Sequence, residues 1–104
     1  MRWGMPELGS LVSKVRSKNA GPFWLTVDVF CDDPVTYARV RDGLKDATVA
    51  KLFGVEQQLL KRFDIPALNV VKFSVPRPVV QGTRADRDMH GAGWACLLEE
   101  LQID

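Results

Sequence analysis

The sequence predicts a single α+β domain, or a small α/β domain, from three observations. A chain of 104 residues builds one hydrophobic core and rarely divides into two. Two segments rich in β-branched and aromatic residues, 23–31 and 67–75, have the composition of strands. Segments with helical spacing and helix-capping signals precede and separate them, so we expect a helix, a strand, a helical crossover and a second strand.

The first expected element is a helix from about Pro6 to Lys18. Apolar residues recur at helical spacing between Leu8 and Val15, which places them on one face. Gly21 and Pro22 follow, and they are typical of the end of a helix because glycine adopts the left-handed cap and proline cannot continue the helix.

The second expected element is a strand over Phe23–Cys31. Every second residue in it is apolar, so one face of the strand should point into the core. The other face, which includes Trp24 and Phe30, also carries large apolar side chains. A strand that is covered on both faces usually lies in the middle of a sheet, so we expect this strand to be central.

Two helices are expected to follow. Asp33 and Pro34 predict the start of the first, because an aspartate caps a helix and proline is tolerated in its first turn. A short second helix is expected from about Ala47 to Phe53, with Gly54 as its C-cap. One or two further helical turns are expected within Glu56–Phe63.

The second strand is expected over Ala67–Val75, and Pro76 and Pro78 end it because proline cannot donate a ladder hydrogen bond. A helical crossover between two strands predicts that they run parallel. The segment Val79–Gly93 is a long loop rich in glycine, arginine and aspartate, and Trp94–Ile103 fits either a helix or a final strand.

Composition excludes several classes of protein. Hydrophobic residues make up 46% and charged residues 26%, as in ordinary globular domains, and the net charge is only +1. Without a global positive field, nucleic acid is not an expected partner. No apolar run approaches the ~18 residues of a membrane span and no signal peptide follows the first methionine, so we expect no membrane contact. Two unrelated cysteines suit free thiols in a cytoplasmic protein.

Two basic turns are the candidates for anion binding. Lys18 and Asn19 offer a cation and an amide in a turn of small residues, and Arg77 is held between two prolines. Such groups bind a carboxylate or a phosphate. Arg87 in the later loop adds a further cation. The alternative interpretation is an ordinary helix stop and solvated surface charges.

We expect these groups to form one polar patch in which Asp88 neutralises one of the cations. Parallel strands would place the turn before the first strand and the turn after the second strand at opposite ends of the sheet. The patch therefore requires the long loop over 79–93 to fold back across a sheet edge, and loops of that length are usually functional or mobile.

Asp88 and His90 are the catalytic candidates, with the carboxylate orienting the only histidine for acid–base chemistry. The alternative is a structural, hydrogen-bonded histidine. Asp86, Asp88 and His90 would share a face of an extended segment as metal ligands do. The neighbouring Arg84 and Arg87 instead favour ion pairs in a surface turn, so we expect no metal. No complete dinucleotide or phosphate-loop motif is present, so no cofactor is expected either.

Four strings, taken in order, resemble a known family: RSKNAGPF at 16–23, PRP at 76–78, Gly82, and RDMHGA at 87–92. They are similar to a small uncharacterised domain family that is fused to, or encoded beside, proteins of the acyclic terpene utilisation AtuA type. The resemblance covers the chain from about Leu8 to Ile103. It implies a cytoplasmic partner subunit or appended domain of a larger metabolic protein in organic acid or acyl-CoA catabolism. The polar positions that the resemblance marks for testing are Lys18, Asn19, Asp28, Arg77, Arg87 and Asp88.

Two classes of function are left open. The first is a non-catalytic accessory subunit that completes a site on a large partner, for which Trp3, Trp24 and Trp94 would serve as aromatic anchors unless they pack in the core. The second is a stand-alone small enzyme that acts on an anionic substrate through Asp88 and His90. The small volume and single histidine favour the first class. The sequence leaves a homo-oligomer open.

Overall fold

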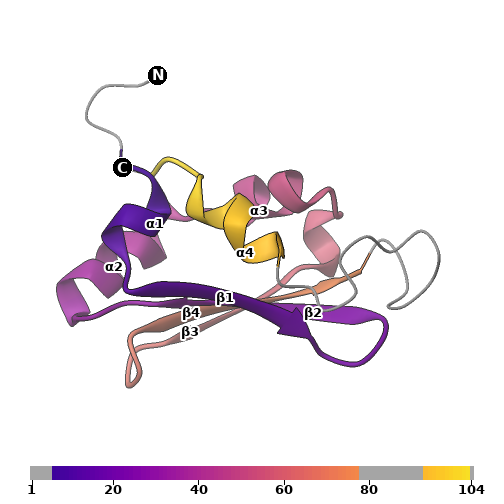
Figure 1. Ribbon diagram of the computed structural model, residues 1–104, viewed down its shortest axis with the longest axis horizontal. Helices are drawn as coiled ribbons and strands as arrows, with labels where there is room; N and C mark the ends of the chain where they lie inside the picture. Colours follow the sequence, from indigo (N-terminus) through magenta and orange to yellow (C-terminus); the bar gives the residue numbers. More distant parts are fainter. Residues whose placement is uncertain (1–5, 78–92, 104) are drawn as a thin grey trace.

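A four-stranded antiparallel sheet forms one layer of the computed structural model, and helices form the other layer (Figure 1). The structure describes residues 6–77 and 93–103. This architecture confirms the α+β prediction. The strands lie in the order β1-β2-β4-β3 and comprise β1 (Lys14–Asn19), β2 (Trp24–Phe30), β3 (Lys61–Ile65) and β4 (Val70–Pro76). The helices are α1 (Leu8–Leu11), α2 (Pro34–Gly43), α3 (Asp46–Phe53), the 3₁₀ turn η1 (Gln57–Leu59) and α4 (Gly93–Glu99).

The core lies between the helices and the two central strands, β2 and β4. Alternate residues of β2, from Leu25 to Val29, are fully buried, and they pair with Val75, Phe73 and Val71 of β4. Because directly paired residues of neighbouring strands share one face of a sheet, these side chains form a continuous apolar layer beneath the helices. The central position that the sequence predicts for β2 is confirmed.

The predicted parallel arrangement of the two central strands is wrong, because β2 and β4 pair antiparallel. A helical turn expected within Glu56–Phe63 is present as η1, but the strand β3, which begins at Lys61, was not predicted. β3 and β4 are joined through a tight turn at residues 66–69, with Asn69 at a positive φ of 55°. The helical crossover does connect two strands of the same direction, but these are β2 and β3, and β4 is inserted between them.

The expected helix over Pro6–Lys18 is also wrong beyond its first turn. Only Leu8–Leu11 is helical, and Lys14–Asn19 forms the edge strand β1, paired antiparallel with β2. Val15 satisfies both the helical and the strand period, but Val15 and Ser17 alternate with exposed basic residues as a half-buried strand requires. Pairing also satisfies the backbone of β2 on that side, a non-local gain that outweighs local helix propensity. Gly21, at a φ of 78°, therefore lies in the β1–β2 hairpin loop.

The two predicted helices after β2 are confirmed, together with their caps. Asp33 Oδ1 accepts a hydrogen bond from Thr36 N at 2.7 Å, and Pro34 occupies the first turn of α2. This backbone hydrogen bond is the main reason that the pKa of Asp33 lies below its ordinary value of 3.8. Gly54 ends α3 in the left-handed conformation, with a φ of 69°.

Asp33→Ala is expected to lower Tm near pH 7 by ~4 °C, because the variant loses the N-cap acceptor of α2. The folded-state pKa lies below the unfolded value, so the charged cap stabilises the protein above that value. Its contribution is lost as the pH falls through the folded-state pKa. Thermal melts near pH 7 and near pH 2 measure this effect, and Asp33→Ser, which retains a neutral acceptor, is the control. A difference between wild type and Asp33→Ala that stays constant down to about pH 2 contradicts the assignment.

The C-terminal segment forms a helix, which is one of the two alternatives that its sequence left open. Residues 93–99 form α4, and Gln102 then forms an isolated antiparallel bridge with Glu7. The Oγ of the buried Ser17 accepts a hydrogen bond from Ala95 N at 2.9 Å, so a side chain of β1 caps the first turn of α4. This contact joins the edge of the sheet to the helical layer.

Arg62 of β3, at the opposite edge of the sheet, connects this strand to α2 and α3. Its guanidinium donates hydrogen bonds to the carbonyl oxygens of Leu44 and Arg41 at the end of α2. It also forms ion pairs with Asp46 at 3.0 Å and with Asp64 at 2.8 Å. Carbonyl groups at the end of a helix have no partner within the helix, so this arginine supplies the missing donors.

Candidate functional site

One end of the sheet brings together two of the residues that the sequence singled out. Asn19 ends β1 and Arg77 follows β4, and both neighbour the start of β2 because β2 pairs antiparallel with both strands. Arg77 Nη1 donates a hydrogen bond to Asn19 Oδ1, and Arg77 N donates to Phe23 O at 2.8 Å. The two turns were expected at opposite ends of a parallel sheet, and the antiparallel pairing instead joins them directly.

Lys18 is set apart from this contact. It pairs with Thr26, whereas Asn19 pairs with the buried Leu25, so successive residues of β1 point to opposite faces of the sheet. The side chain of Lys18 is exposed on the face away from the helices. Arg87, Asp88 and His90 lie outside the described residues, as do Trp3 and the loop over 79–92, so the full polar patch and the catalytic pair stay predictions.

The face of the sheet opposite the helices is the broadest candidate for a functional surface. The helices that the structure describes all lie on one side of the sheet, as Figure 1 shows. We call the other side the open face. Its residues are Lys14, Arg16 and Lys18 of β1, Trp24, Thr26, Asp28 and Phe30 of β2, Lys61, Phe63 and Ile65 of β3, and Val70, Lys72, Ser74 and Pro76 of β4.

Positive charge gathers on the open face. It carries five cationic side chains and a single carboxylate, although the whole chain has a net charge of only +1. The remaining residues are therefore net acidic. In one row across the sheet, Arg16 and Lys72 flank Asp28, and Phe63 follows Lys72. This row places the carboxylate between two cations of the neighbouring strands.

Two buried polar atoms of the open face have no hydrogen-bond partner. Asp28 Oδ1 and Thr26 Oγ1 are both shielded from solvent, and nothing in the described structure donates to or accepts from them. Thr26 is only 8% exposed. Within residues 6–77 and 93–103, Asp28 forms no ion pair with Arg16 or Lys72. Unpaired buried polar groups are rare in folded proteins, so two neighbouring ones mark this place as unusual.

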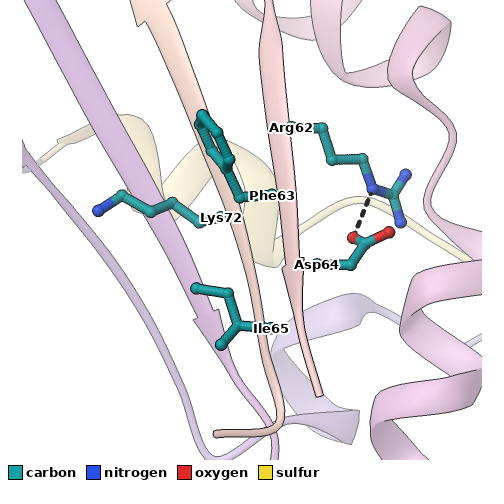
Figure 2. A pocket seen from close by; sticks show the side chains of 5 residues that line it. All are labelled: Arg62, Phe63, Asp64, Ile65 and Lys72. Carbon is teal, nitrogen blue, oxygen red and sulfur yellow. Dashed lines mark hydrogen bonds and ion pairs between the residues drawn. The ribbon is translucent and has the colours of Figure 1, made fainter. Parts of the chain in front are cut away.

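Two exposed aromatic rings lie on the same face of the sheet as this polar centre. Phe63 is 49% exposed and Trp24 is 36% exposed, with Lys61 Nζ at 5.5 Å from the centroid of the indole ring. Figure 2 shows Phe63, Ile65 and Lys72 on one side of the sheet, and Arg62 and Asp64 turned toward the helices on the other. The corner formed by β3 and β4 therefore carries Phe63 and Ile65 beside the cation Lys72 on the open face, and an ion pair on the covered face.

The described residues contain no group of three or more acidic, cysteine or histidine side chains that could hold a metal ion. Burial, and then the charges of Asp33 and Asp32, raises the pKa of the Cys31 thiol. A thiol held in its protonated form is a poor nucleophile.

Part of this surface could have been found in the sequence. Lys61–Ile65 alternates in the pattern of a strand, and recognising β3 would have brought Lys61 and Phe63 onto the sheet. Asp28 was marked by the family resemblance alone. Thr26 was not marked, because the lack of a hydrogen-bond partner depends on side chains from three strands.

The fold and the open face define a class, a two-layer α+β domain with helices on one side of an antiparallel sheet and a cationic, aromatic surface on the other. No helix within the described ranges is long and apolar enough to cross a bilayer. The chain belongs to the family of the domain of unknown function DUF4387, whose family model matches residues 8–102. No curated protein and no solved structure matches it.

Proposed function

We propose that this chain is a small cytoplasmic partner subunit, or accessory domain, of a larger metabolic protein. The observation that carries the proposal is the open face, where exposed rings of Trp24 and Phe63 stand beside cations. Exposed aromatic side chains on a rigid sheet are typical of protein interfaces, in which a few such anchors supply most of the binding energy.

The class of partner follows from the resemblance of the four sequence strings. We propose a protein of the AtuA type that acts in organic acid or acyl-CoA catabolism.

A contribution to an anion-binding site is the second part of the proposal, and it uses Asn19, Arg77 and Arg87. Lys18 was expected to join them, but its side chain lies on the opposite face of the sheet. The contact between Asn19 and Arg77 supports this part of the proposal. The Asn19 amide oxygen accepts from Arg77 Nη1, so this contact fixes the orientation of the guanidinium at the end of β1. A guanidinium held in this way is suited to a carboxylate or a phosphate of the partner's substrate.

Co-purification tests the proposal. The tagged full chain is purified from its native cells, and it is also co-expressed with an AtuA-type protein from the same genome. Size-exclusion chromatography with light scattering should show a complex of constant stoichiometry in both preparations. A chain that elutes alone as a monodisperse monomer in both preparations contradicts the proposal.

A further inference from the structure

The centre of the open face contains two polar atoms that lack a hydrogen-bond partner in the part of the chain that the structure describes. Thr26 and Asp28 lie on the central strand β2, and each has a buried polar atom without a hydrogen-bond partner. Cations of β1 and β4 stand on either side of Asp28, but they form no described ion pair with it. Such atoms are costly to desolvate, and a donor that arrives from outside the chain would satisfy them.

We propose that the open face docks a protein surface of the inverse charge pattern. At its centre, a lysine, arginine or other hydrogen-bond donor of the partner approaches β2 from the open face, displaces the side chains that shield Asp28 Oδ1 and binds this oxygen. Around this donor, aspartate and glutamate side chains of the partner face Arg16, Lys18 and Lys72. The apolar contact is made on the exposed rings of Trp24 and Phe63. This inference rests on the proposed function as a partner subunit and names the surface that the subunit uses.

The same observations disfavour two other occupants. A nucleic acid or an anionic lipid would bring phosphate groups to the cations, but it would also bring them against the Asp28 carboxylate in the middle of the face. A second copy of the chain that docked face to face would oppose the two cationic surfaces, because a twofold interface presents the same patch on both sides. Only a protein surface with acidic groups around a donor complements the whole pattern.

The proposal separates the stability of the chain from its binding. Asp28→Asn keeps the shape of the side chain and removes the charge of a carboxylate whose Oδ1 has no hydrogen-bond partner in the described structure. Thr26→Val replaces an unpaired buried hydroxyl with a methyl group and retains β-branching. We expect Thr26→Val to melt at or above the temperature of the wild type. Asp28→Asn should stay folded with a slightly lower melting temperature, because the flanking Arg16 and Lys72 lose their neighbouring carboxylate. Asp28→Asn should nevertheless weaken docking roughly tenfold, since a charge pair at the centre of the interface is lost.

The experiment measures binding of the full chain to the purified AtuA-type protein by calorimetry. Lys72→Glu and Phe63→Ala should each weaken binding by roughly tenfold or more. Their matched controls lie on the helical layer, where Lys51→Glu and Val35→Ala alter exposed residues of α3 and α2 and should leave the affinity unchanged. Thermal melts of every variant confirm that the fold is retained.

The possible failures are distinct. Wild-type chain that does not bind the AtuA-type protein overturns the proposed function, and this surface assignment with it. Wild-type binding that survives Asp28→Asn and Lys72→Glu overturns only the assignment of the open face. A single-stranded oligouridylate and vesicles of phosphatidylcholine with phosphatidylglycerol serve as further probes. Binding to either probe that becomes tighter in Asp28→Asn identifies a phosphate surface and overturns the protein-docking proposal.

Discussion

Arg62→Met is expected to lower the free energy of unfolding by about 3 kcal/mol, because a half-buried network loses its only cation. The side chain of Arg62 is only 15% exposed. Its removal leaves the carbonyl groups of Leu44 and Arg41 without this donor and leaves the carboxylates of Asp46 and Asp64 without their counter-charge. Methionine retains much of the apolar stem, so the loss reports the guanidinium rather than packing.

Urea denaturation of the wild type and the variant measures this loss. Arg41→Met is the matched control, because Arg41 pairs with the adjacent Asp42 in an exposed position and the same substitution there should cost a small fraction as much. Arg62→Lys should fall between the two, since an ammonium group cannot serve carbonyls and carboxylates in several directions at once. Equal losses for Arg62→Met and Arg41→Met would show that the network does not fasten β3 to the helices.

Local signals in the sequence are sufficient for the elements between β2 and α3. The start of α2 is encoded by Asp33 and Pro34 within two neighbouring positions, and the end of α3 by Gly54 in a left-handed conformation. β2 is recognisable because apolar alternation and β-branched and aromatic residues occur within one short segment. Each of these features depends on residues close together in the chain, and each was predicted.

The edge strands β1 and β3 depend on pairing with distant residues, and neither strand was predicted. β1 was assigned to a helix because Val15 fits both periods, and only pairing with β2 decides between them. Only the first residues of β3 fell within the helical turns predicted over Glu56–Phe63, and no strand was predicted there, so its hairpin with β4 was overlooked and the direction of β4 was predicted wrongly. A single missed strand thus reverses the direction assigned to its neighbour.

The candidate site shows the same division. Asn19 and Arg77 were chosen for their chemistry, yet their contact follows from the antiparallel pairing that the sequence analysis did not predict. The polar centre of the open face arises where β1, β2 and β4 place side chains in one row. Residue types are visible in a sequence, whereas the absence of a hydrogen-bond partner is a property of the assembled sheet.

Phe73→Ala is expected to lower the free energy of unfolding by about 4 kcal/mol, the larger of the two effects on stability. Phe73 lies on β4, is fully buried and is the largest side chain in the centre of the core. It pairs with Val27 of β2 and Arg62 of β3, and the Arg62 guanidinium lies 5.6 Å from the centroid of its ring. Truncation therefore opens a cavity beneath the helices and removes the support of the Arg62 network. A domain of this size has a total stability of roughly 5–15 kcal/mol, so the variant should be close to unfolding at physiological temperature.

Phe63→Ala is the control, because it is the same substitution on the opposite face of the sheet, where the ring of Phe63 is half exposed. It should cost about 1 kcal/mol or less. Phe73→Leu, which fills most of the cavity, should lie between the two. Denaturant titrations measure all three variants, and a double variant with Arg62→Met tests the contact between the two side chains. Because each single change disturbs the same cluster, the free energy of unfolding lost in the double variant should be smaller than the sum of the losses in the two single variants. Full additivity would mean that Phe73 and Arg62 stabilise the sheet independently. A loss for Phe63→Ala as large as that for Phe73→Ala would contradict the assignment of the hydrophobic core to the face that carries Phe73.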